Sequence, residues 1–174
     1  MRADRAFTAR AISTFGLDRL YRVYISGNQF VFIKIGGQAG VAVGISSQFG
    51  LVGSLLFAWW QKQSRQKLQQ RIGADDGLNL RDLLARDRSN FLLDPGQIVW
   101  ATIEPPSRIG AHGPHHGMWK FEESNGKKRT LQFEELSEMR EAMAVLPALL
   151  GPSLTIKAEW NEKKGRYTKP GAPG

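Results

Sequence analysis

The sequence predicts an α+β fold, a small antiparallel β-sheet or barrel of about seven strands with a C-terminal capping helix. Three observations predict it. Short segments of aromatic and β-branched residues end at turn residues, as strands do. Residues 134–150 repeat apolar side chains at the period of an amphipathic helix. A run of 27 uncharged residues, 35–61, follows the second predicted strand and indicates a Gly-rich helical insertion.

The first predicted elements form a β-hairpin. Residues 20–26 and 30–35 are rich in Tyr, Val, Ile and Phe, and Gly27 and Asn28 between them favour a turn. After the insertion, residues 78–87 are predicted to form a short amphipathic helix. Its leucines share one face and are Leu80, Leu83 and Leu84.

The second half of the chain predicts two more hairpins, a helix and a last strand. Each hairpin flanks a turn sequence: residues 91–93 and 97–103 flank Asp94-Pro95-Gly96, and residues 118–121 and 130–133 flank Ser124-Asn125-Gly126. The helix over 134–150 has acids in its first turns, and Pro147 is expected to kink or shorten it. Residues 153–160 alternate apolar and polar side chains and predict a strand after the helix.

The chain has 174 residues, enough for one domain with its own core and too few for two full domains. We predict a flexible segment over residues 1–19, a single domain over 20–160 with an insertion at 36–72, and a disordered basic tail over 161–174. The absence of cysteine excludes disulfides, thiolate catalysis and cysteine-ligated zinc. Residues 1–20 lack the apolar stretch of a secretory signal, so we expect a cytoplasmic location.

Four segments in this order carry a resemblance to a known family: Tyr21-Arg-Val-Tyr24, Phe30-Val-Phe-Ile-Lys-Ile-Gly-Gly37, Leu83-Leu84-Ala-Arg-Asp87 and Met118-Trp-Lys-Phe121, with the closing helix after them. Their layout over residues 20–150 resembles bacterial pleckstrin-homology-like (PH/GRAM-like) domains of no assigned function that carry a Gly-rich insertion. The resemblance implies a curved antiparallel sheet capped by a C-terminal helix. It also implies binding of membranes, phosphoinositides or peptides rather than catalysis.

The insertion carries the most distinctive pattern of the chain. Small residues recur every four positions, which on a helix lines one face and lets another backbone or a lipid approach closely. An aromatic and then cationic border follows, as where a helix leaves a membrane. The predicted membrane or partner contacts are Gly36, Gly40, Gly44, Gly50, Ser54, Trp59 and Trp60, and the predicted anionic-headgroup contacts are Lys62, Arg65, Lys67 and Arg71.

Three interpretations of the insertion stay open. A single transmembrane helix is long enough, since about 20 apolar residues span a bilayer. However, if the strands on both sides of the run pair with each other, both of its ends lie on the same side of the membrane. The alternatives are two shorter helices, broken near Ser46-Ser47-Gln48, that enter one leaflet or that pack against the domain or a second subunit.

The formal net charge of +8 favours an anionic partner, although a solvated surface explains it equally well. Nucleic acid is the second candidate partner, with stacking by Tyr21, Tyr24 and Trp119 and phosphate contacts from Lys127, Lys128 and Arg129. Aromatic residues at alternate strand positions are more often core, and a basic turn is more often simply solvated. Membrane contact therefore ranks first.

We find no catalytic constellation. His112, His115 and His116 have spacings that a metal site could use, but no carboxylate or cysteine lies beside them, so we predict no metal and no cofactor. The segment 36–40 lacks the Gly-Lys-Ser/Thr ending of a phosphate-binding loop. We expect a non-enzymatic binding module, peripheral on the inner face of the membrane or bound to a partner protein, with RNA binding or homo-oligomer formation as alternatives.

Overall fold

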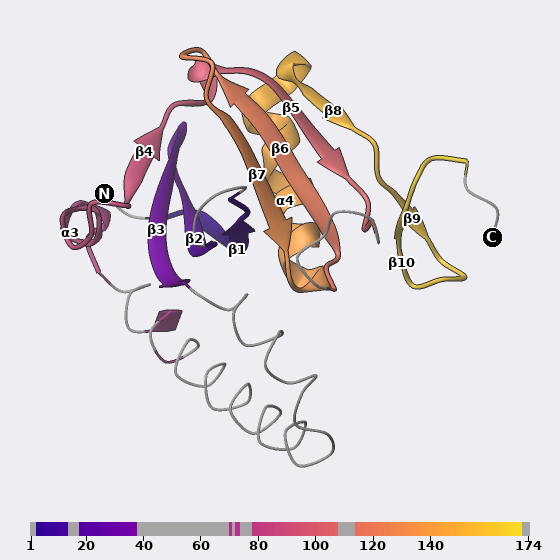
Figure 1. Cartoon of the computed structure of the whole chain (residues 1–174), viewed down its shortest axis with the longest axis horizontal. Helices are drawn as coiled ribbons and strands as arrows, with labels where there is room; N and C mark the ends of the chain where they lie inside the picture. Colours follow the sequence, from indigo (N-terminus) through magenta and orange to yellow (C-terminus); the bar gives the residue numbers. More distant parts are fainter. Residues whose placement is uncertain are drawn as a thin grey trace.

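The computed structural model describes residues 3–13, 18–37, 70, 72–73, 78–107 and 114–171. Within them, eight strands form one curled sheet in the order β4-β3-β2-β1-β7-β6-β5-β8, and helix α4 (Leu136–Leu150) lies behind β6 and β7 (Figure 1). The strands are β1 (Arg5–Ala11), β2 (Arg19–Ser26), β3 (Gln29–Gly37), β4 (Phe91–Leu93), β5 (Ile98–Glu104), β6 (Gly117–Glu123), β7 (Lys128–Phe133) and β8 (Leu154–Ile156). The predicted α+β class is thereby confirmed, as a mostly β fold with one long helix.

Several predicted elements are confirmed. β2 and β3 form the first hairpin, and β6 and β7 form the hairpin around Gly126, whose φ of 80° suits glycine. Helix α3 (Leu80–Ala85) begins at Asn79, whose side chain accepts a hydrogen bond from the Arg81 N–H. Helix α4 continues through Pro147 to Leu150. The proline therefore does not shorten the predicted helix.

The sheet differs from the small antiparallel sheet of about seven strands that the sequence predicted. β8 joins β5 in parallel register, with Leu154 beside Ala101 and Ile156 beside Ile103, so the sheet is mixed. The predicted hairpin of residues 91–103 is wrong. β4 pairs with β3, β5 pairs with β6, and the short 3-10 helix η1 (Pro95–Gln97) between them is held by a capping box of Asp94 and Gln97.

Both chain ends contain strands where the sequence predicted none. β1 lies in the segment that was expected to be flexible, where Phe7 and Ala9 face the core and pair with Val23 and Tyr21 of β2. The predicted strand 153–160 is divided between β8 and β9 (Glu159–Asn161) by the buried Ala158. β9 pairs with β10 (Arg166–Thr168), within the predicted disordered tail.

Two apolar clusters lie on opposite faces of the sheet. The larger joins aromatic side chains such as Phe7, Phe30 and Trp119 to the apolar face of α4, including Met139 and Leu146. Its rings meet mostly edge to face, and the centroids of Phe30 and Trp119 are 5.4 Å apart. The second cluster covers the other face of β2 and β3 and consists of Tyr24, Val31, Ile33, Ile35, Ile72, Leu80 and Leu83.

Candidate functional site

Most of the predicted contact residues lie outside the described part of the chain. These are Gly40, Gly44, Gly50, Ser54, Trp59, Trp60, Lys62, Arg65, Lys67 and Arg71. Gly36 is described. It lies in β3 opposite Leu20, and a Cβ at this position would be 3.6 Å from the Cβ of Leu20, an ordinary contact. Gly36 thus belongs to the β2–β3 ladder, and the segment with the remaining contact residues begins just after β3.

That segment lies between the end of β3 and a buried residue that packs on one face of β3. The chain leaves the sheet at Gly37, the last residue of β3. On the other side of the segment, Ile72 is 9% exposed and belongs to the same apolar cluster as Ile33 and Ile35 of β3. The intervening 34 residues, 38–71, therefore begin and end at the same face of the sheet. Among the described residues, no helix is long and apolar enough to cross a membrane.

The arginines near the start of the chain bind helix α4 and do not form an anion site. Arg5 pairs with Glu141 at 3.4 Å, Arg22 pairs with Glu138 at 3.6 Å, and Arg10 pairs with Glu134. Glu138 and Glu141 are three residues apart on α4, and Glu134 lies two residues before the helix begins, so the three acids form one row beside β1 and β2. These ion pairs hold the helix against the two strands and neutralise part of the positive charge.

Glu138 is the most buried acid of this row. Burial raises the pKa of its carboxyl, while the hydrogen bond from the Thr8 backbone and the charge of Arg22 act in the opposite direction. The Thr8 N–H donates to the carboxylate at 2.6 Å, and the Arg22 guanidinium donates to the Thr8 hydroxyl at 3.2 Å. These contacts link the cluster to the docking of α4, although the buried Nε atoms of Arg10 and Arg22 have no hydrogen-bond partner among the described residues.

The aromatic and basic residues predicted for RNA do not form a stacking surface. Tyr21, Tyr24 and Trp119 are 3%, 1% and 0% exposed, so their rings lie in the two cores and no base can reach them. Of the basic turn, Arg129 pairs with Glu123 and lies 4.0 Å over the Phe91 ring, and Lys128 pairs with Glu122 at 3.6 Å. The prediction of base stacking at these residues is wrong.

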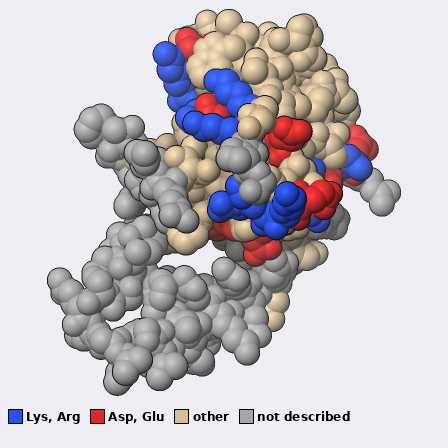
Figure 2. Space-filling view, turned by 90° about the vertical axis from the view of Figure 1, so that its right-hand side faces the viewer, with Lys and Arg blue, Asp and Glu red and all other residues tan. Residues whose placement is uncertain are grey.

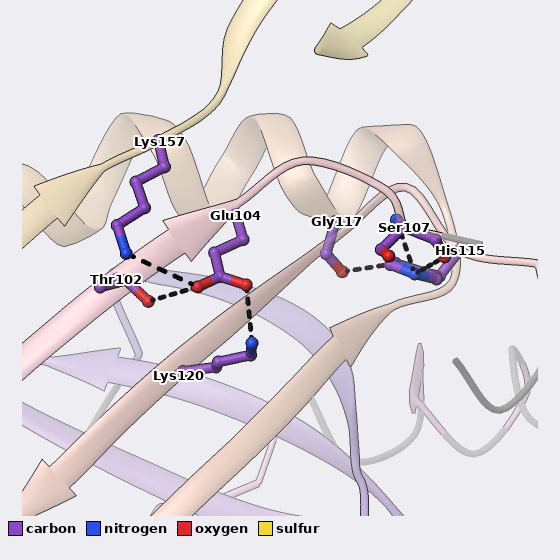
Figure 3. Close-up of polar contacts among 7 residues, drawn as sticks. All are labelled: Thr102, Glu104, Ser107, His115, Gly117, Lys120 and Lys157. Atoms are coloured by element: carbon purple, nitrogen blue, oxygen red, sulfur yellow. Dashed lines mark hydrogen bonds and ion pairs between the residues drawn. The ribbon is translucent and has the colours of Figure 1, made fainter. Parts of the chain in front are cut away.

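The histidine segment closes a loop. His115 is buried and its Nδ1 is 3.2 Å from the Gly117 carbonyl oxygen, while the Ser107 N–H lies 3.2 Å from Nε2 (Figure 3). With the proton on Nδ1, the imidazole donates to Gly117 and accepts from Ser107. His112 lies outside the described residues, and within them no group of three or more His, Cys, Asp or Glu residues could hold a metal ion. His115 thus has a structural use in fastening both ends of this loop.

A second polar cluster in the same view connects three strands. Glu104 of β5 accepts from Lys120 of β6 at 2.6 Å and lies 3.9 Å from Lys157, which follows β8 (Figure 3). Thr102 is at hydrogen-bond distance from the same carboxylate, at 3.5 Å. Because one carboxylate is shared by two lysines, these cations are engaged within the sheet.

The β9–β10 hairpin lies partly in the segment that was predicted to be a disordered basic tail, so the sequence analysis anticipated its charge and missed its strands. Trp160 and Tyr167 are cross-strand partners with ring centroids 5.3 Å apart, and the Arg140 guanidinium of α4 lies 4.6 Å from the Trp160 ring centroid. Tyr167 also packs against the larger core. The exposed cations of the hairpin are Lys163, Lys164, Arg166 and Lys169. Figure 2 faces this end of the molecule and shows Lys and Arg side chains gathered there with acidic side chains among them.

A signal for this hairpin is present in the sequence. Trp160 and Tyr167 stand on either side of a turn sequence that ends in Gly165, whose φ of 56° is typical of glycine. The Lys and Gly content of the segment was interpreted as disorder and outweighed this aromatic pair.

Comparison of the whole chain with protein-family models, with curated proteins and with solved structures found no significant match.

Proposed function

We propose that this chain is a non-enzymatic binding module that associates with an anionic membrane surface through residues 38–71. The observation that carries the proposal is the pairing of an uncharged, small-residue segment with two attachment points on one face of a folded sheet. A segment attached in this way leaves the domain and returns to it. It can therefore present its apolar residues to a surface while the sheet remains folded beside that surface.

The length of residues 38–71 favours entry into the membrane from one side and disfavours a crossing of the membrane. A segment of 34 residues that leaves and returns has about 17 residues for each direction, and about 17 helical residues reach about 25 Å. The hydrocarbon core of a bilayer is about 30 Å thick. Each half is thus too short to cross, whereas contact with one leaflet needs only part of that length.

Composition supports an anionic membrane in particular. Trp59 and Trp60 have the amphipathic rings that favour the headgroup region, and four cations follow them within residues 62–71. Each cation near an anionic bilayer contributes about 1 kcal/mol. Four such charges and two indoles would hold the protein reversibly on an anionic surface, peripheral on its cytoplasmic side.

The resemblance to pleckstrin-homology-like domains is retained as part of this proposal, with β1 added to the predicted domain of residues 20–160 because it lies between β2 and β7 in the sheet. A curled sheet with a long helix after its last antiparallel strand supports it. β8 and the β9–β10 hairpin follow that helix and would be additions to such a domain. A fold of this kind does not determine function by itself, so the insertion carries the functional argument.

A partner protein or a second copy of the chain is the alternative ligand of the same segment. The ladder of Gly40, Gly44, Gly50 and Ser54 suits close helix packing as well as lipid contact. Under this alternative, Gly40→Leu and Gly50→Leu would convert an oligomer into monomers in analytical ultracentrifugation. Under the membrane proposal, both variants would sediment as the unmodified chain does in the absence of lipid.

Vesicle sedimentation tests the proposal. The full chain should pellet with vesicles that contain phosphatidylglycerol, and pelleting should fall as salt rises or when the vesicles are pure phosphatidylcholine. Replacing Lys62, Arg65, Lys67 and Arg71 by Gln should release the protein. A matched control replaces four exposed cations elsewhere, Arg81, Arg86, Arg88 and Lys127, by Gln and should still pellet. Equal pelleting of both variants, or with neutral vesicles at high salt, would contradict the electrostatic part.

A further inference from the structure

We propose a second binding surface on this chain: the β9–β10 hairpin binds the phosphodiester backbone of a nucleic acid. The contacts would come from Lys163, Arg166 and Lys169. The proposal goes beyond the membrane contact of residues 38–71 and does not depend on it. β8, which leads into the hairpin, is six strands away from β3 in the sheet, and the hairpin and β3 lie at opposite sides of Figure 1.

Charge pairing distinguishes this hairpin from the eight-stranded sheet that it adjoins. Most basic residues of the sheet are in ion pairs with its own acids or with α4. These residues are Arg5, Arg10, Arg22, Lys34, Lys120, Lys128, Arg129 and Lys157. In contrast, Lys163, Arg166 and Lys169 form no ion pair with any residue that the structure describes. Their charge is available to an external anion.

Strand alternation determines which way these cations point. Trp160 and Tyr167 are register partners, so they share one face of the hairpin, where Tyr167 packs against the core and Arg140 lies over Trp160. Arg166 precedes Tyr167 in the same strand and therefore projects from the opposite face, and it is exposed. Lys163 lies in the exposed turn. The aromatic face thus fixes the hairpin on the domain, Arg166 projects from the opposite face, and Lys163 in the turn and Lys169 after β10 are exposed.

The composition of the hairpin favours a nucleic acid over a membrane. Its turn, Glu162 to Gly165, is fully exposed and contains no apolar side chain that could enter the headgroup region. Bases have no access to the packed face of Trp160, so we expect contacts to phosphates alone and little preference for sequence.

Fluorescence anisotropy with labelled oligonucleotides of 20 residues, single-stranded RNA and duplex DNA, tests the proposal on the full chain. The variant replaces Lys163, Arg166 and Lys169 by Gln. The control removes the same charge elsewhere, by replacing Arg81, Arg88 and Lys127 by Gln. We expect the hairpin variant to bind about tenfold or more weakly and the control to bind as the unmodified chain does. Circular dichroism melting should be the same for all three proteins.

The salt dependence gives a second readout. For single strands the slope of log K against log salt changes by about 0.7 for each phosphate contact, so the hairpin variant should have a slope shallower by about 2. Equal loss in the hairpin variant and the control would mean a general charge effect and would overturn the proposal. So would unchanged affinity of the hairpin variant. Hairpin-dependent binding to phosphatidylglycerol vesicles without binding to either oligonucleotide would assign the surface to lipid and would also overturn it.

Discussion

The carboxylate of Glu138 accepts a hydrogen bond from the backbone N–H of Thr8 at 2.6 Å, which joins helix α4 directly to strand β1. β1 is paired with β7 only at Arg10 and Ala11, so its earlier residues diverge from the neighbouring strand. A helical side chain thereby satisfies a backbone donor near the point where the sheet opens. The closing helix is consequently part of the hydrogen-bonding of the sheet as well as its apolar cover.

Removing that acceptor should destabilise the fold. In Glu138→Ala the Thr8 N–H loses its acceptor and Arg22 loses one of its partners in a partly buried site, and we expect a loss of about 2 kcal/mol in the free energy of unfolding. Glu138→Gln keeps a carbonyl oxygen as an acceptor and should lose less. Urea denaturation of both variants measures the difference. Equal stability of Glu138→Ala and the unmodified chain would contradict this role.

The same residue predicts a dependence of stability on pH. Burial raises the pKa of Glu138 above its usual value of 4.5 in the folded state. A raised folded pKa means that its contribution is fully present below pH about 4.5 and is lost as pH rises through the folded value. The stability of the unmodified chain relative to Glu138→Gln should therefore decline as the pH rises from 4 to 7. An increase of this stability difference between pH 4 and pH 7 would contradict the raised pKa of Glu138.

Asp87 should give folding stability a pH dependence opposite to that of Glu138, with a contribution that is lost at acid pH. Its carboxylate accepts from the Ser89 backbone and from Lys34 at 3.1 Å, and these contacts lower its pKa from 3.8 to about 2. Its contribution is present above pH 3.8 and is lost as pH falls toward 2. Asp87→Asn should be less stable than the unmodified chain at pH 6 and equal to it near pH 2. A stability difference of the same size at pH 6 and near pH 2 would contradict this contribution of Asp87.

Gly117 should tolerate no side chain. A Cβ there would lie 2.8 Å from the Met139 Sδ and 2.9 Å from the Glu104 carbonyl oxygen, and the φ of 156° is unfavourable for other residues. We expect Gly117→Ala to lose about 1–3 kcal/mol of stability through overpacking between β6 and α4. In Gly73→Ala the new Cβ meets nothing within 4 Å, so its thermal unfolding should match that of the unmodified chain.

Much of the central fold could be predicted because it depends on local patterns. The β2–β3 and β6–β7 hairpins have clear turns, and α4 has a regular apolar stripe. β1 was missed because Ala6, Ala9 and Ala11 replace the branched residues that usually indicate a strand. The parallel β5–β8 pairing was missed because it joins residues about 50 positions apart, with no turn between them to indicate it.

The binding surfaces were less predictable than the fold. Counting cations could not distinguish Arg22, which pairs with Glu138, from Arg166, which projects from the β9–β10 hairpin. That distinction depends on the position of α4, which brings Glu138 next to Arg22 and Glu141 next to Arg5. The return of the chain at Ile72 to the face of β3 was inferred only conditionally, because the pairing of distant strands had to be assumed.

Residues 38–71 are proposed to enter an anionic bilayer from one side. A site-specific fluorescent label can report this entry. The chain contains no cysteine, so Leu51→Cys or Lys127→Cys can each be labelled with an environment-sensitive dye at one position. We predict that phosphatidylglycerol vesicles shift the emission of the dye at position 51 to the blue and that a quencher in the same leaflet reduces it. The dye at position 127 should not respond. An unchanged spectrum at position 51 with vesicles present would contradict the proposed membrane contact.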